Sequence, residues 1–187
     1  MMKFMSEERF MEYIGEMERH GKINENNKKG ETILYWACSN NMERVAMELI
    51  PKMSEEAINK WTNNGDTALY WACRDGMERV VMELISRMSE EAINKWTSNG
   101  YTTLIIACLK GKERVAMELI QRISEETINK WCDDGCTALY WACQEGMERV
   151  AIELIPRMSE EAINKCDKYG YSALYFACNN SMERALS

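Results

Sequence analysis

The sequence predicts an all-α fold built from stacked helix–turn–helix repeats. One observation is that residues 65–73 recur with few changes from Gly30, Gly100, Gly135 and Gly170. Successive copies lie 35 residues apart, and a fixed period of this size is the signature of a repeat architecture. A second observation is that apolar residues inside each period recur at helical spacing. Because stacked repeats bury one continuous core, the chain is expected to form a single array.

A first helix is expected directly after each turn glycine. In residues 65–99, Gly65 supplies the positive φ that the turn needs, and Thr67 can cap the following helix with its hydroxyl. The residues that would form the apolar stripe of this helix are Leu69, Ala72 and Cys73. Asp75-Gly76 is expected to end it.

Two further helical segments are expected in the same repeat. The second helix should run from Met77 to Arg87, with aliphatic residues on its inner side. Ser89 can then cap a short helical turn that contains the acidic pair at residues 90–91. This acidic pair recurs in every linker, which favours helix capping over catalysis, because active-site carboxylates are normally unique.

The period sets the expected boundaries of the array. Residues 1–29 are interpreted as an N-terminal capping helix, a partial repeat with Ser6 at its start and Gly21 after its end. The predicted repeats are residues 30–64, 65–99, 100–134, 135–169 and a partial repeat at 170–187. Because the last repeat stops early, we expect the array to continue in a longer protein; the alternative is that this end frays.

Charge and hydropathy argue against two classes of partner. The net charge is −7 and acids alternate with bases, whereas a nucleic-acid binder needs a concentrated basic face. No apolar run approaches the roughly 20 residues that span a bilayer. The start, Met1 to Phe4, lacks the apolar stretch of a secretory signal. Neither nucleic acid nor a membrane is therefore expected as a partner.

The cysteines point to a reducing compartment. Five of the eight share one repeat position: Cys38, Cys73, Cys108, Cys143 and Cys178. Stacked helices lie about 8–10 Å apart, whereas a disulfide needs Cα atoms roughly 4.4–6.8 Å apart. Equivalent cysteines therefore cannot pair, and the protein is expected to be intracellular and cytoplasmic.

No catalytic or cofactor site is expected. The one histidine, His20, falls at a helix end, where it suits the helix dipole. Three cysteines, Cys132, Cys136 and Cys166, lie on or beside adjacent turns, but they include no CxxC pair and have no histidine nearby to complete a zinc site. They are interpreted as surface cysteines without a metal.

The repeat resembles the ankyrin repeat. The shared pattern is a turn glycine, Thr-Ala-Leu, a small pair, a second glycine, an aliphatic helix and an aliphatic–Asn pair, and it covers about residues 9–187. The period here is 35 residues, whereas the usual ankyrin period is about 33 residues, and the extra residues fall in the Met-Ser-Glu-Glu-Ala segment. The resemblance implies an ankyrin-repeat solenoid with hairpin-like loops. This variant looks most like arrays of protists and large DNA viruses, which would place the protein in a host cytosol.

The resemblance also implies a concave face that binds a protein partner, formed by the turn tips and the exposed side of the first helices. Matched residue by residue, that face includes Lys28, Lys29, Arg74, Asp75, Tyr101, Leu109, Lys110, Asp133, Asp134, Glu145, Tyr169 and Tyr171.

Two aromatic series could either bind or pack. Trp61, Trp96 and Trp131 precede successive turns, at a position that in the family points toward the partner. Trp71 and Trp141 belong to a series on the first helices. Tryptophan dominates binding hot spots, but a regular ladder of rings also suits packing between repeats. Packing is favoured for the first-helix series, and neither reading is favoured for the other.

The predicted function is therefore a non-enzymatic protein–protein interaction module. One alternative is an adaptor that tethers a target to an effector domain outside this chain, and such a domain would appear in a longer gene. Another is a structural spacer or self-assembling array, which would show concentration-dependent oligomers. A monomer is expected, with end-to-end association through the unfinished last repeat as the alternative.

Overall fold

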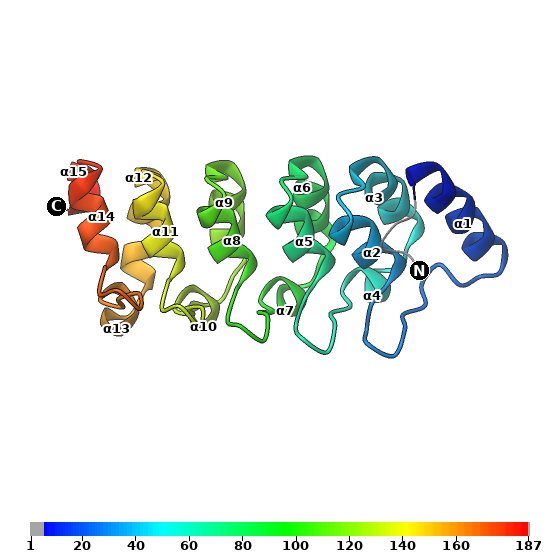
Figure 1. Cartoon of the computed structure of the whole chain (residues 1–187), viewed down its shortest axis with the longest axis horizontal. Coiled ribbons are helices and arrows are strands. Elements are labelled where there is room, and N and C mark those ends of the chain that lie inside the picture. The colour runs from blue at the N-terminus through cyan, green and yellow to red at the C-terminus, as the bar shows by residue number, and fades with distance from the viewer. Residues whose placement is uncertain (1–5, 187) are drawn as a thin grey trace. The chain divides into compact units, whose positions relative to one another are not determined.

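The structure, a computed structural model, describes residues 6–186 of the chain (Figure 1). The expectations for Met1 to Phe4 and for Ser187 lie outside these residues. The described residues form two compact units, divided between Ile93 and Asn94. They contain helices and isolated β-bridges but no β-strand, so the predicted all-α fold is confirmed.

A first helix follows each turn, as predicted. These helices are α2 (Ile33–Ser39), α5 (Ala68–Arg74), α8 (Thr103–Leu109), α11 (Ala138–Gln144) and α14 (Ala173–Asn179). The hydroxyl of Thr67 accepts a hydrogen bond from the backbone N–H of Tyr70 at 3.1 Å, which confirms the predicted cap. Ser172 caps α14 in the same way. Capping satisfies a backbone donor that would otherwise lack a partner.

Second and third helices complete each repeat. The second helices are α3 (Glu43–Leu49), α6 (Glu78–Arg87), α9 (Glu113–Ile120), α12 (Glu148–Leu154) and α15 (Glu183–Leu186). The short third helices are α4 (Glu55–Ile58), α7 (Glu90–Ile93), α10 (Glu125–Ile128) and α13 (Glu160–Ile163), and 3₁₀ turns η2 (Ile50–Lys52) and η3 (Ile155–Arg157) precede two of them. Ser89 caps α7, as predicted, by accepting the N–H of Ala92. Within residues 6–186, no helix is both long and apolar enough to cross a bilayer.

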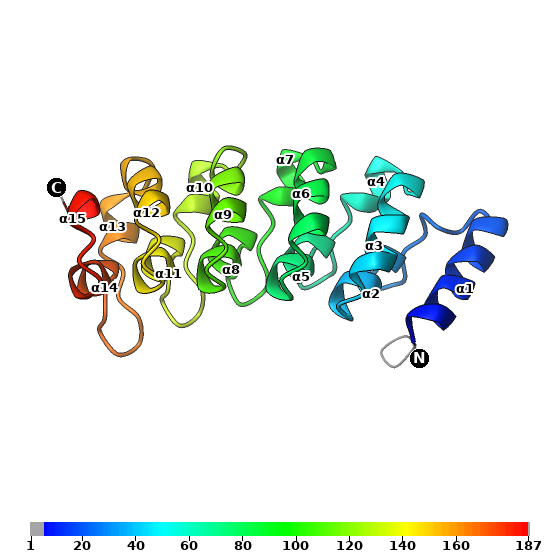
Figure 2. The ribbon, with the colours of Figure 1, turned by 90° about the horizontal axis from the view of Figure 1, so that it is seen from above.

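Inside each unit, the first helices of neighbouring repeats pack against one another, and so do the second helices. In the first unit α2 packs on α5 and α3 on α6; in the second, α8 packs on α11 and α11 on α14. Figure 2 shows first helices along one side of each unit and second helices along the other. The core repeats as well: Leu34, Leu69, Leu104 and Leu139 share one repeat position and are all buried. The same position on α14, Leu174, is 60% exposed.

The N-terminal helix α1 (Glu7–Arg19) occupies the place of a second helix. It packs on α3 and buries Phe10 and Ile14. Ser6 caps its start, and Gly21 follows its end with a φ of +66°. The helix bounds and these contacts are what the structure shows, and the capping role of residues 1–29 stays a prediction.

Side chains from one repeat cap helices of the next. The carboxamide oxygen of Asn24 accepts the backbone N–H of Ser54 at 2.8 Å, and Asn59 does the same for Ser89. In the second unit Asn94 and Asn129 repeat this bond to Ser124 and Ser159. The aliphatic–Asn pair of the sequence therefore has a structural function: it locks each exit loop to the following short helix.

Candidate partner-binding face

Backbone hydrogen bonds hold the turn tips and, within each unit, join neighbouring tips. In the fourth turn Gly135 donates to the carbonyl of Cys132, and Cys132 donates to the carbonyl of Cys136. The N–H of Asp133 reaches back to the carbonyl of Asn99 at 3.0 Å, and the N–H of Lys168 reaches Asp134 at 3.1 Å. The tips within a unit are therefore tied in a fixed register, which is the geometry that a rigid binding surface needs.

The predicted face residues differ widely in exposure. Trp61 and Trp96 are each 37% exposed, and Tyr169 is 74% exposed. The other exposed members are Lys28, Lys29, Lys110, Asp133, Asp134, Glu145 and Tyr171. The half-buried members are Trp71, Arg74, Asp75, Tyr101, Leu109, Trp131 and Trp141. The turn tips thus present mostly accessible side chains, whereas the first-helix members are partly covered.

Two charged pairs are already satisfied inside the protein. Arg74 Nε donates to Asp75 Oδ1 at 2.8 Å, and the guanidinium lies 3.8 Å above the ring of Trp71. Lys168 Nζ lies 2.9 Å from Asp134 Oδ1. A partner that uses these charges would have to share or break an existing pair, which reduces the gain from each contact.

Aromatic side chains of the first helices pack against each other. In the first unit Tyr35 meets Trp71 edge to face, with ring centroids 6.0 Å apart, and Tyr70 meets Trp71 at 5.7 Å. In the second unit Tyr140 meets Trp141 at 5.2 Å. The indole nitrogens of Trp71 and Trp141 are buried, without a hydrogen-bond partner among the described residues. These contacts agree with the favoured packing role, and partner binding by the two tryptophans stays a prediction.

The tryptophans before the turns are placed differently. The ammonium of Lys130 lies 3.9 Å from the ring centre of Trp96, and that of Lys165 lies 4.2 Å from Trp131. Trp61 borders a groove of about 480 Å³ whose other lining residues are Asn26, Gly30, Glu56, Asn59 and Lys60. These rings are therefore accessible at the edges of the loops, and their role in binding stays a prediction.

Tyr140 and Asp167 form a polar contact within the second unit. The hydroxyl of Tyr140 donates to Asp167 Oδ2 at 2.8 Å, and Oδ1 accepts the N–H groups of Tyr169 and Tyr171, each at 2.9 Å. Burial, followed by the bond to Asp167, raises the pKa of Tyr140. Desolvation opposes ionisation of Asp167, but bonds from the backbone of Tyr171 and from Tyr140 outweigh it and lower the pKa of its carboxyl.

We expect Tyr140→Phe to lower the free energy of unfolding by about 1 kcal/mol at neutral pH, because it removes this one hydrogen bond. The pKa of Asp167 is lower in the folded state than in the unfolded chain, so its ionised carboxylate stabilises the fold at a pH above the ordinary carboxyl pKa. This stabilisation is lost as the pH falls through the pKa of the folded state. The deficit of the variant should therefore shrink below about pH 4. Urea denaturation across this pH range measures it. Tyr70→Phe is the matched control, since the Tyr70 hydroxyl makes no hydrogen bond within residues 6–186. An equal loss in both variants would contradict the assignment.

The structure corrects the interpretation of two cysteines. Cys132 is 1% exposed and Cys136 is 5% exposed, so neither is a surface cysteine; Cys166 is exposed. Cys132 and Cys136 occupy the repeat positions that Thr62 and Asp66 hold two repeats earlier. Burial, followed by the neighbouring Cys132, raises the pKa of Cys136 to about 12, so its thiol is neutral at physiological pH. Within residues 6–186, no group of three or more histidine, cysteine or acidic side chains is placed to hold a metal.

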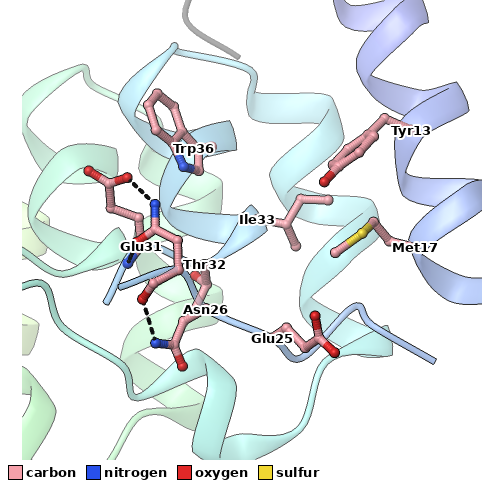
Figure 3. Close-up of a pocket in the computed structure, with 9 residues that line it drawn as sticks. Tyr13, Met17, Glu25, Asn26, Glu31, Thr32, Ile33 and Trp36 are labelled. Atoms are coloured by element: carbon pink, nitrogen blue, oxygen red, sulfur yellow. Dashed lines mark hydrogen bonds between the residues drawn. The ribbon is translucent and has the colours of Figure 1, made fainter. Parts of the chain in front are cut away.

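Sequence reasoning missed a pocket between α1 and α2. It has a volume of about 210 Å³ and includes Tyr13, Glu25, Glu31 and Trp36 in its lining. Figure 3 shows Tyr13 and Met17 reaching it from α1, opposite Ile33 and Trp36 of α2. The signal was present in the sequence, because residues 1–29 were interpreted as a repeat without its first helix.

Comparison with solved structures supports this fold. One similar chain belongs to a complex of the Bd0816 predatory endopeptidase from Bdellovibrio bacteriovorus with immunity protein Bd3460: identity is 23%, the TM-score is 0.62, and the match covers 94% of this chain and 91% of that chain. An ankyrin repeat domain from Acinetobacter baumannii AYE has 20% identity and a TM-score of 0.66, with 94% and 90% covered. The ankyrin repeat protein EF0377 has 21% identity and a TM-score of 0.63, with 95% of each chain covered.

Sequence comparison identifies the family. No curated protein sequence matches the chain. The family model described as ankyrin repeats, in three copies, matches residues 8–95 and again residues 76–160. The two matches together span most of the chain, and they coincide with the repeating helices and turn tips described above. The chain therefore belongs to the ankyrin-repeat family.

Proposed function

We propose that this chain binds a partner protein through its turn tips and first helices, without covalent chemistry. Ankyrin repeats generally mediate protein–protein interaction, and the family is typically non-enzymatic. One structural neighbour is a chain of a complex between a predatory endopeptidase and an immunity protein, which supports a role in recognition for this fold. The eight cysteines of this chain are all free, as is usual in a reducing compartment, so the partner is expected inside the cell.

The observation that carries the proposal is the contrast between a repeated scaffold and variable tips. Scaffold positions such as Leu104 and Leu139 are identical and buried. Tip residues at equivalent places change chemistry, from Lys28 and Lys29 in one turn to Asp133 and Asp134 in another, and they are exposed. Backbone bonds hold these tips in register. A rigid surface of varied chemistry is suited to recognising one partner, because little ordering entropy is lost on binding.

Affinity capture with matched variants tests the proposal. The face variant carries Trp96→Ala, Trp131→Ala and Tyr169→Ala in the second unit. The control variant carries Glu118→Ala, Ile152→Ala and Glu153→Ala, which are positions of the second helices. We expect the parent chain and the control variant to capture the same protein from a lysate of the source cell or its host, and the face variant to lose it.

Two readouts make this experiment decisive. Circular dichroism must show that both variants keep the helical content of the parent, so that a loss of capture reports on the surface. Capture kept by the face variant and lost by the control variant would place binding on the second-helix side, and the proposal would be wrong.

A further inference from the structure

The pocket between α1 and α2 has the size of a site for one side chain. Small-molecule sites usually occupy roughly 300–1,000 Å³, whereas this pocket has about 210 Å³. It is open because α1 packs on α3 as a second helix would, and the described residues include no first helix on that side of α2. The pocket is lined within the first unit, by α1, α2 and the loop between them.

The lining combines aromatic surface with negative charge. Tyr13 supplies one ring from α1, with Met17 beside it, and Trp36 supplies a second ring from α2, with Ile33 on the same helix (Figure 3). Glu25 and Glu31 supply two carboxylates, and none of the nine lining residues is Lys, Arg or His. Aromatic faces and carboxylates both attract cations.

The polar part of the lining is held in place before any ligand arrives. Asn27 Nδ2 donates to Glu31 Oε2 at 2.6 Å, and Asn27 Oδ1 accepts the backbone N–H groups of Lys29 and Glu31. Asn26 Nδ2 donates in turn to the carbonyl of Asn27 at 3.0 Å. The carboxylate of Glu25 has no hydrogen-bond or ion-pair partner among residues 6–186. Glu25 is therefore the acceptor that remains available to a cation.

We propose that this pocket binds an arginine side chain of the partner protein. A guanidinium is flat, so it can lie against Trp36 or Tyr13 while its N–H groups reach Glu25. An aliphatic side chain in the same place would remove water from Glu25 without replacing its hydrogen bonds. The adjoining loop exposes three lysines, Lys22, Lys28 and Lys29, but none of them lines the pocket. The attraction of a cation therefore comes from the pocket lining and acts only at short range. That the arginine belongs to a partner protein rests on the proposed function. That the pocket binds a guanidinium does not depend on the proposed function.

Nuclear magnetic resonance on the full chain tests the pocket with small probes. The ¹⁵N-labelled protein is titrated with N-acetylarginine methylamide, with the citrulline analogue and with the lysine analogue. Citrulline has the shape of arginine but carries no charge. We expect arginine to shift the indole N–H signal of Trp36, assigned with Trp36→Phe, and the backbone signals of residues 25–32. Lysine should bind more weakly, and citrulline should cause no shift at the same concentration.

A pair of variants separates the pocket from general electrostatics. Glu25→Gln should weaken arginine binding roughly tenfold, the size of one charge-assisted hydrogen bond. Glu16→Gln makes the same change of net charge on an exposed face of α1 and should leave the affinity unchanged. Equal binding of citrulline, equal effects of the two variants, or shifts centred on Asp133 and Asp134 would overturn the proposal. Such a result would leave the proposed function standing, because the capture experiment uses other residues.

Discussion

Replacing Gly135 with alanine should destabilise the protein by about 2–5 kcal/mol. The glycine has a φ of +84°, and a Cβ built on it would lie 2.4 Å from the carbonyl oxygen of Cys166. A left-handed conformation costs a non-glycine residue about 1–2 kcal/mol, and overpacking against a neighbour adds about 1–3 kcal/mol. The clash is with backbone, so no side-chain rotation relieves it. The free energy of unfolding, from urea denaturation followed by circular dichroism, measures the effect.

The repeat itself offers a matched control for this prediction. Gly170 holds the same position with a φ of +87°, but no atom lies within 4 Å of its built Cβ. Gly170→Ala should therefore cost only the conformational part, about 1–2 kcal/mol. The difference between the variants isolates the close approach of successive turns. Equal losses would mean that the turns of the second unit do not stack as described.

Replacing Leu139 with alanine should cost about 2–5 kcal/mol, the range for a buried leucine. Leu139 is 2% exposed, on a helix that packs against both α8 and α14. The loss comes from the removed apolar contacts and from the cavity left in a core that cannot fully relax. Thermal and urea denaturation both report it, and the far-ultraviolet spectrum before denaturation shows whether the variant still folds.

Leu174→Ala is the control, since this leucine has the same repeat position and is 60% exposed. Its cost should stay within about 0.5 kcal/mol, as for other surface substitutions. A loss as large as that of Leu139→Ala would contradict the exposure of α14. If that loss grew with protein concentration, association of copies through this face would be the cause.

The helices and their caps were predictable because their causes are local. Thr67 and Ser89 cap helices that begin within three residues of them, and apolar residues at helical spacing mark the buried stripe. A period of 35 residues then repeats the same local solution along the chain. The position of the binding face stays a prediction that rests on the family resemblance, because one sequence does not show which side of a stack remains open.

Contacts across a repeat were decided by the tertiary structure. The bond from Ser124 to Asn94 joins residues 30 positions apart, and no local pattern marks Asn94 as a capping residue. Cys132 and Cys136 flank turn residues, and the sequence predicts them at the surface, yet they are buried. In each case the neighbour comes from the packing of the chain rather than from the pattern of the residue types.

The sequence by itself determined the repeat, the helices, their caps and the family of this protein, because each depends on spacing within one period. Only the tertiary structure decided which aromatic rings pack, which thiols are buried and where a pocket opens. These properties depend on which side chains of a neighbouring repeat cover each position. Leu139 is buried while Leu174, at the same repeat position, is exposed, and the pocket beside Trp36 opens between α1 and α2.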